Sequence, residues 1–203
     1  MRKKHLMVAL FLMTVCSLLL FSVPAYAYNA TKAVNYADTY ALQPNNSFRY
    51  FSGHDCTNFA SQIIAAGGVK QSGNWYYNNG HNYSATWTVA DSFKWYIKDI
   101  YGATRLASGW TKTGRYHGSV YLYPYINNSA NIPASGKVVV FYDWHDDGII
   151  DHTSYCVGTG YSLDQNIYSD LVNQHSTNRK RTRWTLDTYN DARYDTAIYA
   201  FGL

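Results

Sequence analysis

Apolar residues in the first half of the chain recur at helical spacing. One stripe, with spacings of three and four residues, consists of Ala33, Tyr36, Ala37 and Tyr40. Such a stripe covers one face of a helix that has 3.6 residues per turn. The sequence therefore predicts a first helix that ends near Pro44.

A second helix is predicted from the stretch GHDCTNFASQ, residues 53–62. Asp55 is a favourable N-cap, and Gly67-Gly68 supplies a C-terminal stop. The buried face would comprise Phe59, Ile63 and Ile64. Cys56 then falls on the first turn.

The segment 69–88 is rich in Gly, Asn, Trp and Tyr and has little periodicity, so we expect a long aromatic loop. Residues 89–102 return to helical spacing, with Phe93, Ile97 and Ile100 along one side.

The second half of the chain changes to strand patterns. Residues 137–143, 152–160 and 196–203 are β-branched and aromatic runs bounded by turn residues, and residues 170–176 give a weaker strand signal. Helices followed by strands predict an α+β domain with an antiparallel sheet.

The N-terminus has the features of a secretory signal peptide. A basic head, Met1-Arg2-Lys3-Lys4, precedes a leucine-rich run and a small-residue cleavage site at Ala25-Tyr26-Ala27. We expect residues 1–27 to be removed and residues 28–203 to form one secreted, monomeric domain without a membrane anchor. Loss of three basic residues reduces the net charge from +4 to +1. This balance does not indicate a nucleic-acid surface.

Cys56 lies at a predicted helix N-terminus, which is one of the two features that activate a thiol. The helix N-terminus and a nearby imidazole together favour the thiolate, which is the nucleophilic form. His152 begins a predicted strand and His175 ends the next, so an antiparallel pair can bring them together. We expect Cys56 as nucleophile, His152 as base and acid, and His175 as the group that orients His152.

A disulfide between Cys56 and Cys156 is the competing interpretation, because extracellular proteins permit pairing. If His152 lies against Cys56, Cys156 is four strand residues away, about 13 Å at roughly 3.3 Å per residue. A disulfide needs Cα atoms within about 7 Å. The two interpretations exclude each other, and we favour the free nucleophile with Cys156 as a buried residue.

The stretch DWHDDGIID partly imitates a calcium loop through Asp143, Asp147, Gly148 and Asp151. His145 and Ser154 stand where such a loop carries acidic or oxygen ligands. Calcium is therefore a weak alternative to an Asp-rich hairpin that positions His152, and no other cofactor is indicated.

These motifs resemble the putative amidase domain family secreted by Gram-positive bacteria. That family is a branch of the papain-like cysteine hydrolases related to NlpC-type and CHAP-type cell-wall peptidases. The resemblance rests on AVNYADTYA, DCTNFASQIIAAGG, FYDWHDDGIIDH and QHSTNR, in that order. It implies Cys56 as nucleophile and His152 as its partner. The polar third member would be His175, with Asn178 and Asp170 as alternatives.

The sequence thus favours a secreted cysteine amidase or peptidase that cleaves an amide bond, with cell-wall peptides of peptidoglycan as substrate. An acyltransferase or transpeptidase would use the same residues. From another class, a non-catalytic wall-binding module could stack glycan on Trp75, Tyr76, Tyr77 and Trp87.

Overall fold

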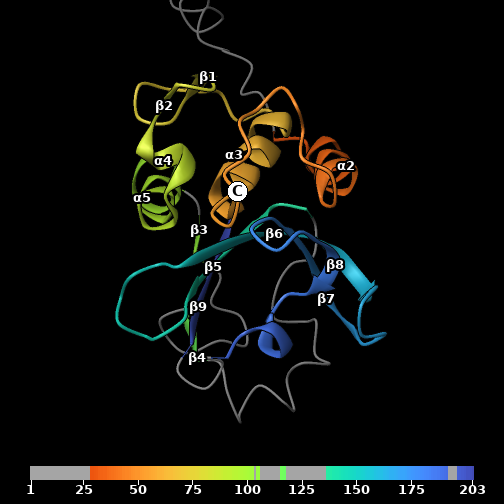
Figure 1. Cartoon of the computed structure of the whole chain (residues 1–203). Helices are drawn as coiled ribbons and strands as arrows, with labels where there is room; N and C mark the ends of the chain where they lie inside the picture. Colours follow the sequence, from red (N-terminus) through yellow and green to blue (C-terminus); the bar gives the residue numbers. More distant parts are fainter. Residues whose placement is uncertain (1–27, 103, 106–114, 118–135, 192–195) are drawn as a thin grey trace, which may run out of the picture.

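The structure, a computed structural model, describes residues 28–102, 104–105, 115–117, 136–191 and 196–203. The expected signal peptide, residues 1–27, lies outside the described residues. Figure 1 shows the main helices grouped on one side of a twisted sheet, with α3 next to strand β6. The mixed α+β class with an antiparallel sheet is confirmed.

Helices dominate the first half of the described chain. They are α2 (Ala30–Tyr40), α3 (Cys56–Ala66), α4 (Ala85–Thr88), α5 (Ala90–Trp95) and the π-helix η1 (Tyr96–Ile100), with a short 3-10 helix η3 (Asp187–Tyr189) near the C-terminus.

The described strands form two sheets. The small sheet is a hairpin of β1 (Tyr77–Asn79) and β2 (Asn82–Tyr83). Within the described residues, the main sheet has seven strands in the order β3-β9-β5-β6-β7-β8, with β4 also paired to β9. They are β3 (Thr104–Arg105), β4 (Arg115–His117), β5 (Val138–Asp143), β6 (His152–Tyr161), β7 (Tyr168–Gln174), β8 (Arg179–Arg183) and β9 (Ala197–Gly202).

Both faces of the central sheet are buried. Val139 and Phe141 of β5 belong to the cluster that contains the helices, whereas Val138, Val140 and Tyr142 pack in a second cluster with Trp184 and Leu186. Successive strand side chains point to opposite faces, so a strand covered on both sides is apolar throughout. This explains the continuous hydrophobic run of β5.

Helix α3 lies at the centre of the helical layer. Every residue from Cys56 to Ile64 is buried, including its polar residues. Ser61 donates a hydrogen bond to the Trp87 carbonyl and accepts one from Trp75 Nε1. The polar side chains of α3 therefore have partners inside the core, as buried polar groups require.

The predicted aromatic loop is wrong in part, because segment 69–88 contains the β1–β2 hairpin and α4. Asn79-Gly80 at the hairpin is a turn signal that favours such a connection. The predicted third helix is present, but its second half is a π-helix. The wider turn leaves Ile100 47% exposed while Ile97 is fully buried.

Strand β8 has no hydrophobic signature, since its sequence is RKRTR. Among the strands that the structure describes, β8 pairs with β7 alone, so it is an edge strand. Charged residues are common on such edges, so the sequence pattern did not reveal it.

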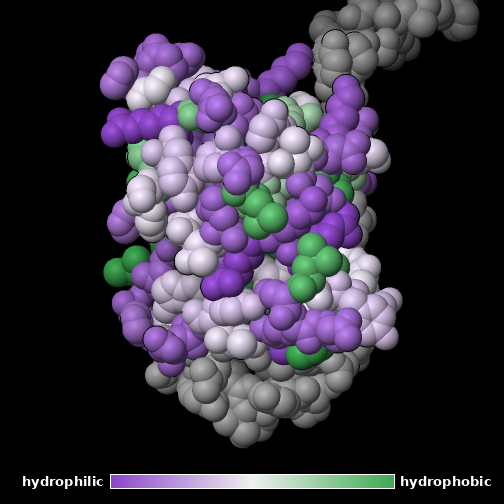
Figure 2. Space-filling model, turned by 45° about the vertical axis from the view of Figure 1, so that its right-hand side comes forward, coloured by the Kyte–Doolittle hydropathy of each residue, from purple (hydrophilic) through white to green (hydrophobic). Residues whose placement is uncertain are grey.

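No helix among the described residues is long and apolar enough to cross a membrane. The face in Figure 2 is mostly hydrophilic, with hydrophobic residues in small separate groups.

Truncation of Ile63 to alanine should lower the free energy of unfolding by about 2–5 kcal/mol, because its fully buried side chain would leave a cavity. Urea denaturation of the purified protein measures this loss. Leu42→Ala is the matched control, since Leu42 is 54% exposed and its change should stay within about 0.5 kcal/mol. Equal losses for both variants would contradict the placement of α3 in the core.

Candidate active site

Cys56 is the first residue of α3, and Asp55 occupies the N-cap position. The Asp55 side chain makes no capping hydrogen bond to the helix, which corrects the expectation that this carboxyl caps α3. Its Oδ1 instead accepts hydrogen bonds from the Phe51 backbone N–H at 3.0 Å and from Asn58 Nδ2 at 2.8 Å. Asp55 therefore fixes the turn that leads into Cys56.

His175 lies against the other side of this carboxyl. Its Nδ1 is 2.6 Å from Asp55 Oδ2, and its Nε2 donates to the Tyr40 carbonyl at 2.8 Å. The imidazole also stacks on Phe59, with ring centres 3.7 Å apart. Both ring nitrogens of His175 have partners within the helical layer. The expected contact between His175 and His152 is therefore wrong.

Gln174 occupies the position expected for His175. His152, the first residue of β6, has its Nε2 2.7 Å from Gln174 Oε1. Gln174 Nε2 donates to the Thr177 carbonyl at 3.2 Å, which fixes the orientation of the amide. The Gln174 oxygen therefore faces His152 and accepts a hydrogen from Nε2, which leaves Nδ1 for Cys56.

The one-residue difference follows from strand geometry. Antiparallel pairing brings the end of β7 to the start of β6, as the sequence predicted. Side chains alternate across a sheet, so Gln174 and His175 point to opposite faces. The turn after β7 includes Ser176 in the left-handed region, with φ of 84°. Because side chains two residues apart in a strand lie on the same face, counting from the buried Val172 places Gln174, and not His175, on that face.

The two alternatives for the third residue lie elsewhere. Asp170 is buried in β7, pairs with Thr159 of β6 and accepts a hydrogen bond from its hydroxyl at 2.9 Å. Asn178 accepts a hydrogen bond from the Tyr50 hydroxyl at 3.3 Å. The structure gives neither a contact with His152.

Cys56 and His152 influence each other's protonation. Burial acts to raise the pKa of Cys56, but the adjacent His152, the Thr57 hydroxyl and the Thr153 backbone amide outweigh it and lower the pKa to about 7. Burial acts to lower the pKa of His152, but Cys56 and Gln174 raise it overall. Both shifts favour a thiolate beside an imidazolium.

The first turn of α3 is hydrogen-bonded to β6. The hydroxyls of Thr57 and Thr153 lie 3.1 Å apart, and Thr57 Oγ1 is 3.7 Å from Cys56 Sγ. Thr57 and Thr153 follow Cys56 and His152 in the sequence, so this contact sets the distance between the two reactive groups.

A cleft of about 470 Å³ opens over the pair. Trp144 stacks on His152, with ring centres 5.6 Å apart and planes inclined by 22°, and shields the imidazole from solvent. The cleft is lined by Gly53, His54, Cys56, Thr57, Thr88, Val89, Ala90, Trp144, Ile150, Asp151, His152 and Ser176. A reactive pair at the wall of a concave site fits an enzyme better than a structural cluster.

The Asp-rich loop uses its carboxylates on its own backbone. Asp143 accepts hydrogen bonds from the N–H groups of Asp147 and Gly148, at 3.1 and 2.9 Å. Asp147 and Asp151 accept from Ile149 and Trp144, at 2.9 and 2.8 Å. In the part of the chain that the structure describes, no group of three His, Cys, Asp or Glu residues could hold a metal ion. The loop geometry is that of a hairpin that leads into His152.

Cys56 and Cys156 are both free thiols, so the competing disulfide is absent between them; Cys156 is fully buried, whereas Cys56 is 8% exposed and lines the cleft. Burial raises the pKa of Cys156 to about 12. The chain therefore has one activated thiol and one inert thiol among its described residues.

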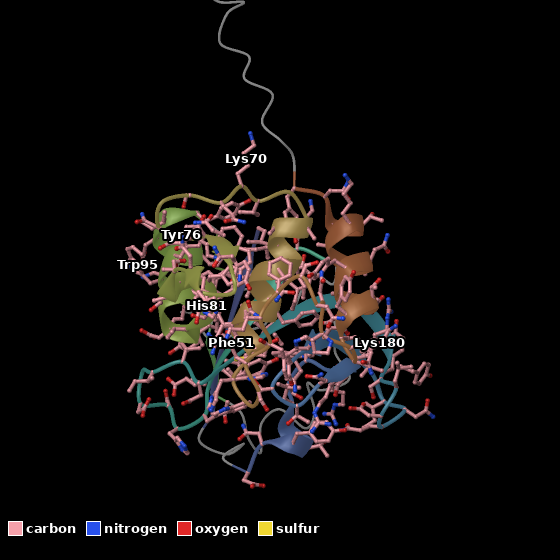
Figure 3. The ribbon with its side chains drawn as sticks, turned by 45° about the horizontal axis from the view of Figure 1, so that its top comes forward. Phe51, Lys70, Tyr76, His81, Trp95 and Lys180 are labelled. Atoms are coloured by element: carbon pink, nitrogen blue, oxygen red, sulfur yellow. The ribbon has the colours of Figure 1, made fainter. Side chains whose placement is uncertain are left out.

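Most of the proposed glycan-stacking aromatics lie in the core. Trp75 and Trp87 are fully buried and stack on each other, and Tyr77 is 8% exposed. Only Tyr76 is partly accessible in this set, and it is labelled in Figure 3. The four rings do not form an exposed stacking platform.

Comparisons with known proteins give one family and two relatives. A family model described as "Putative amidase domain" matches residues 27–199. Uncharacterized protein YjcM of Bacillus subtilis (strain 168) is 32% identical over 152 residues, covering 75% of this chain and 32% of YjcM. Uncharacterized protein YhbB of the same organism is 28% identical over 185 residues, covering 87% of this chain and 50% of YhbB.

The chain spans about a third to a half of the length of these relatives. No solved structure matches the chain.

Alkylation of Cys56 by iodoacetamide should follow an apparent pKa of about 7 rather than the ordinary 9.0 of a thiol. The rate should rise as pH increases through 7 and then level off, because the thiolate is the reactive form. In His152→Ala, the rate at pH 7 should fall at least about tenfold, since burial remains and the stabilising imidazole is lost. Peptide mass analysis locates the label, and an unchanged pH profile in His152→Ala would contradict the pairing.

Gln174 and His175 should give opposite results when each is changed to alanine. His175→Ala should lower the free energy of unfolding by about 2–4 kcal/mol, because buried groups of Asp55 and Tyr40 lose their donor. Its Cys56 alkylation pKa should remain within about half a unit of wild type. Gln174→Ala should cost only about 1 kcal/mol but slow the alkylation of Cys56, because the imidazole loses its orientation. The reverse pattern would assign the orienting role to His175.

Proposed function

Because the chain belongs to the Putative amidase domain family, we propose that it is a secreted, papain-like cysteine hydrolase that cleaves amide bonds in cell-wall peptides. The observation that carries this proposal is that Cys56 and His152 line one cleft and that Gln174 accepts a hydrogen bond from His152. The papain-like resemblance implies a thiol at a helix start, a histidine on a strand and a polar group at the end of the next strand, and Gln174 takes the last position in place of the expected His175.

The first half of the reaction forms an acyl-enzyme. The Cys56 thiolate attacks the carbonyl carbon, and the oxyanion is stabilised by backbone N–H groups at the start of α3, which lack partners within the helix. The S–C bond forms and the C–N bond breaks as His152 gives its proton to the leaving nitrogen. The free amine then departs.

Water completes the cycle. His152, now neutral, takes a proton from water, which attacks the thioester carbonyl and releases the carboxylic acid. The departing sulfur leaves as thiolate and the imidazole is again protonated. In both steps Gln174 accepts the hydrogen bond from His152 Nε2, so Nδ1 of the ring stays directed at Cys56.

Two further features support the proposal. Trp144 limits solvent access to the imidazole, which strengthens the ion pair in the cleft. The signal-peptide pattern of residues 1–27 supports secretion. An accessible extracellular amide substrate on a Gram-positive surface is the peptide of peptidoglycan.

Purified protein should release new amines from defined peptidoglycan stem peptides, detected by liquid chromatography and mass spectrometry. Cys56→Ala should reduce kcat at least about a thousandfold, since the nucleophile is lost. Cys156→Ala is the matched control, because it removes the other thiol from a site without contact to the cleft.

Absence of cleavage across stem peptides and simple aminoacyl amides would contradict the proposed hydrolase. A hydroxamate product formed in the presence of hydroxylamine would report the acyl-enzyme, and its dominance over the acid would assign acyl transfer instead. Activity that survives in Cys56→Ala would remove Cys56 from the mechanism.

A further inference from the structure

A second pocket adjoins the cleft on the other side of His152. It has a volume of about 130 Å³, and Trp144, His152 and Ser176 line both cavities. Its remaining lining comes from Gln174, Thr177, Arg179, Leu186 and Tyr189, whereas Cys56 lines only the larger cleft. A substrate held at Cys56 that extends past the imidazole would enter this smaller pocket.

Arg179 gives this pocket a positive charge. Arg179 is the first residue of β8, and it pairs directly with Gln174 of β7. This pairing places Arg179 beside the residue that accepts a hydrogen bond from His152. Its guanidinium lies over the Tyr189 ring, 3.4 Å from the ring centre. The ring holds the cation in place without neutralising it.

Arg179 has an unused hydrogen-bond donor. Its Nε is buried and has no hydrogen-bond partner, and Arg179 has no ion-pair partner among the residues that the structure describes. The nearby Asp164 accepts hydrogen bonds from Thr182 at 2.5 Å and from the Tyr189 hydroxyl at 2.7 Å. A buried donor on a charged group without a partner is costly, and a bound anion would satisfy it.

We propose that this pocket binds a carboxylate on the leaving half of the substrate, held by Arg179. This inference rests on the proposed function, in which His152 protonates the leaving nitrogen. The leaving group must then lie against the imidazole, and the pocket with Arg179 opens there. The preferred substrates are amides whose amine half is an amino acid or short peptide with a free C-terminal carboxylate.

The test compares two ligands that differ only in this charge, alanylalanine and alanylalaninamide. Isothermal titration calorimetry with Cys56→Ala protein measures both affinities without turnover. The carboxylate should bind at least about tenfold tighter, since a hydrogen bond between charged groups is worth roughly 1.5–3 kcal/mol. Arg179→Gln in the same background should reduce the ratio to within about threefold, and Arg179→Lys should retain part of it.

Lys180→Gln is the matched control, because it removes the same charge from the next residue of β8, which does not line the pocket. Figure 3 labels Lys180 at the outer edge of the molecule. This variant should keep the full ratio. Equal binding of both ligands to the Cys56→Ala protein would by itself overturn the proposal. A tenfold ratio of affinities that persists in Arg179→Gln would also overturn it.

The two proposals can fail separately. Amide cleavage without discrimination between the ligands would overturn the carboxylate site and support the hydrolase. Discrimination that depends on Arg179, in a protein that cleaves no amide, would support the carboxylate site and overturn the hydrolase.

Discussion

The buried contact between Asp55 and His175 holds together the three elements on which the site depends. Asp55 precedes α3, His175 follows β7, and the same imidazole binds the Tyr40 carbonyl at the end of α2. Removal of either partner would leave polar groups buried without hydrogen bonds. The contact thus ties the start of α3 to the end of α2 and to the turn after β7, and it stabilises the helical layer that carries Cys56.

Gln174 and His175 have different roles because adjacent side chains at the end of a strand point to opposite faces of the sheet. His175 faces the helices and binds Asp55, whereas Gln174 faces the smaller pocket and orients His152. Two adjacent polar residues with similar hydrogen-bonding capacity therefore serve separate purposes. Their side-chain orientation assigns these roles, and residue type alone does not.

Sequence periodicity was sufficient for the elements that bury one clear face. The stripe of α2, the start of α3 at Cys56 and strands β5, β6 and β9 were all predictable, because apolar spacing dictates them. The charged β8 was not, because an edge strand needs no apolar residues. Gln174 was missed because apolar spacing did not fix which of two adjacent polar residues at the end of β7 faces His152, and Arg179 because its position depends on the pairing of β7 with β8.

The composition of β8 also bears on how the protein behaves in solution. This strand ends the sheet, and an unpaired strand edge can recruit the edge of another molecule and begin aggregation. Arg179 and Lys180 give it positive charge, whereas Arg181 is paired with Asp38 and Arg183 is buried, so two copies approaching edge to edge bring like charges together. The strand that supplies the cation of the pocket therefore also protects the sheet from self-association.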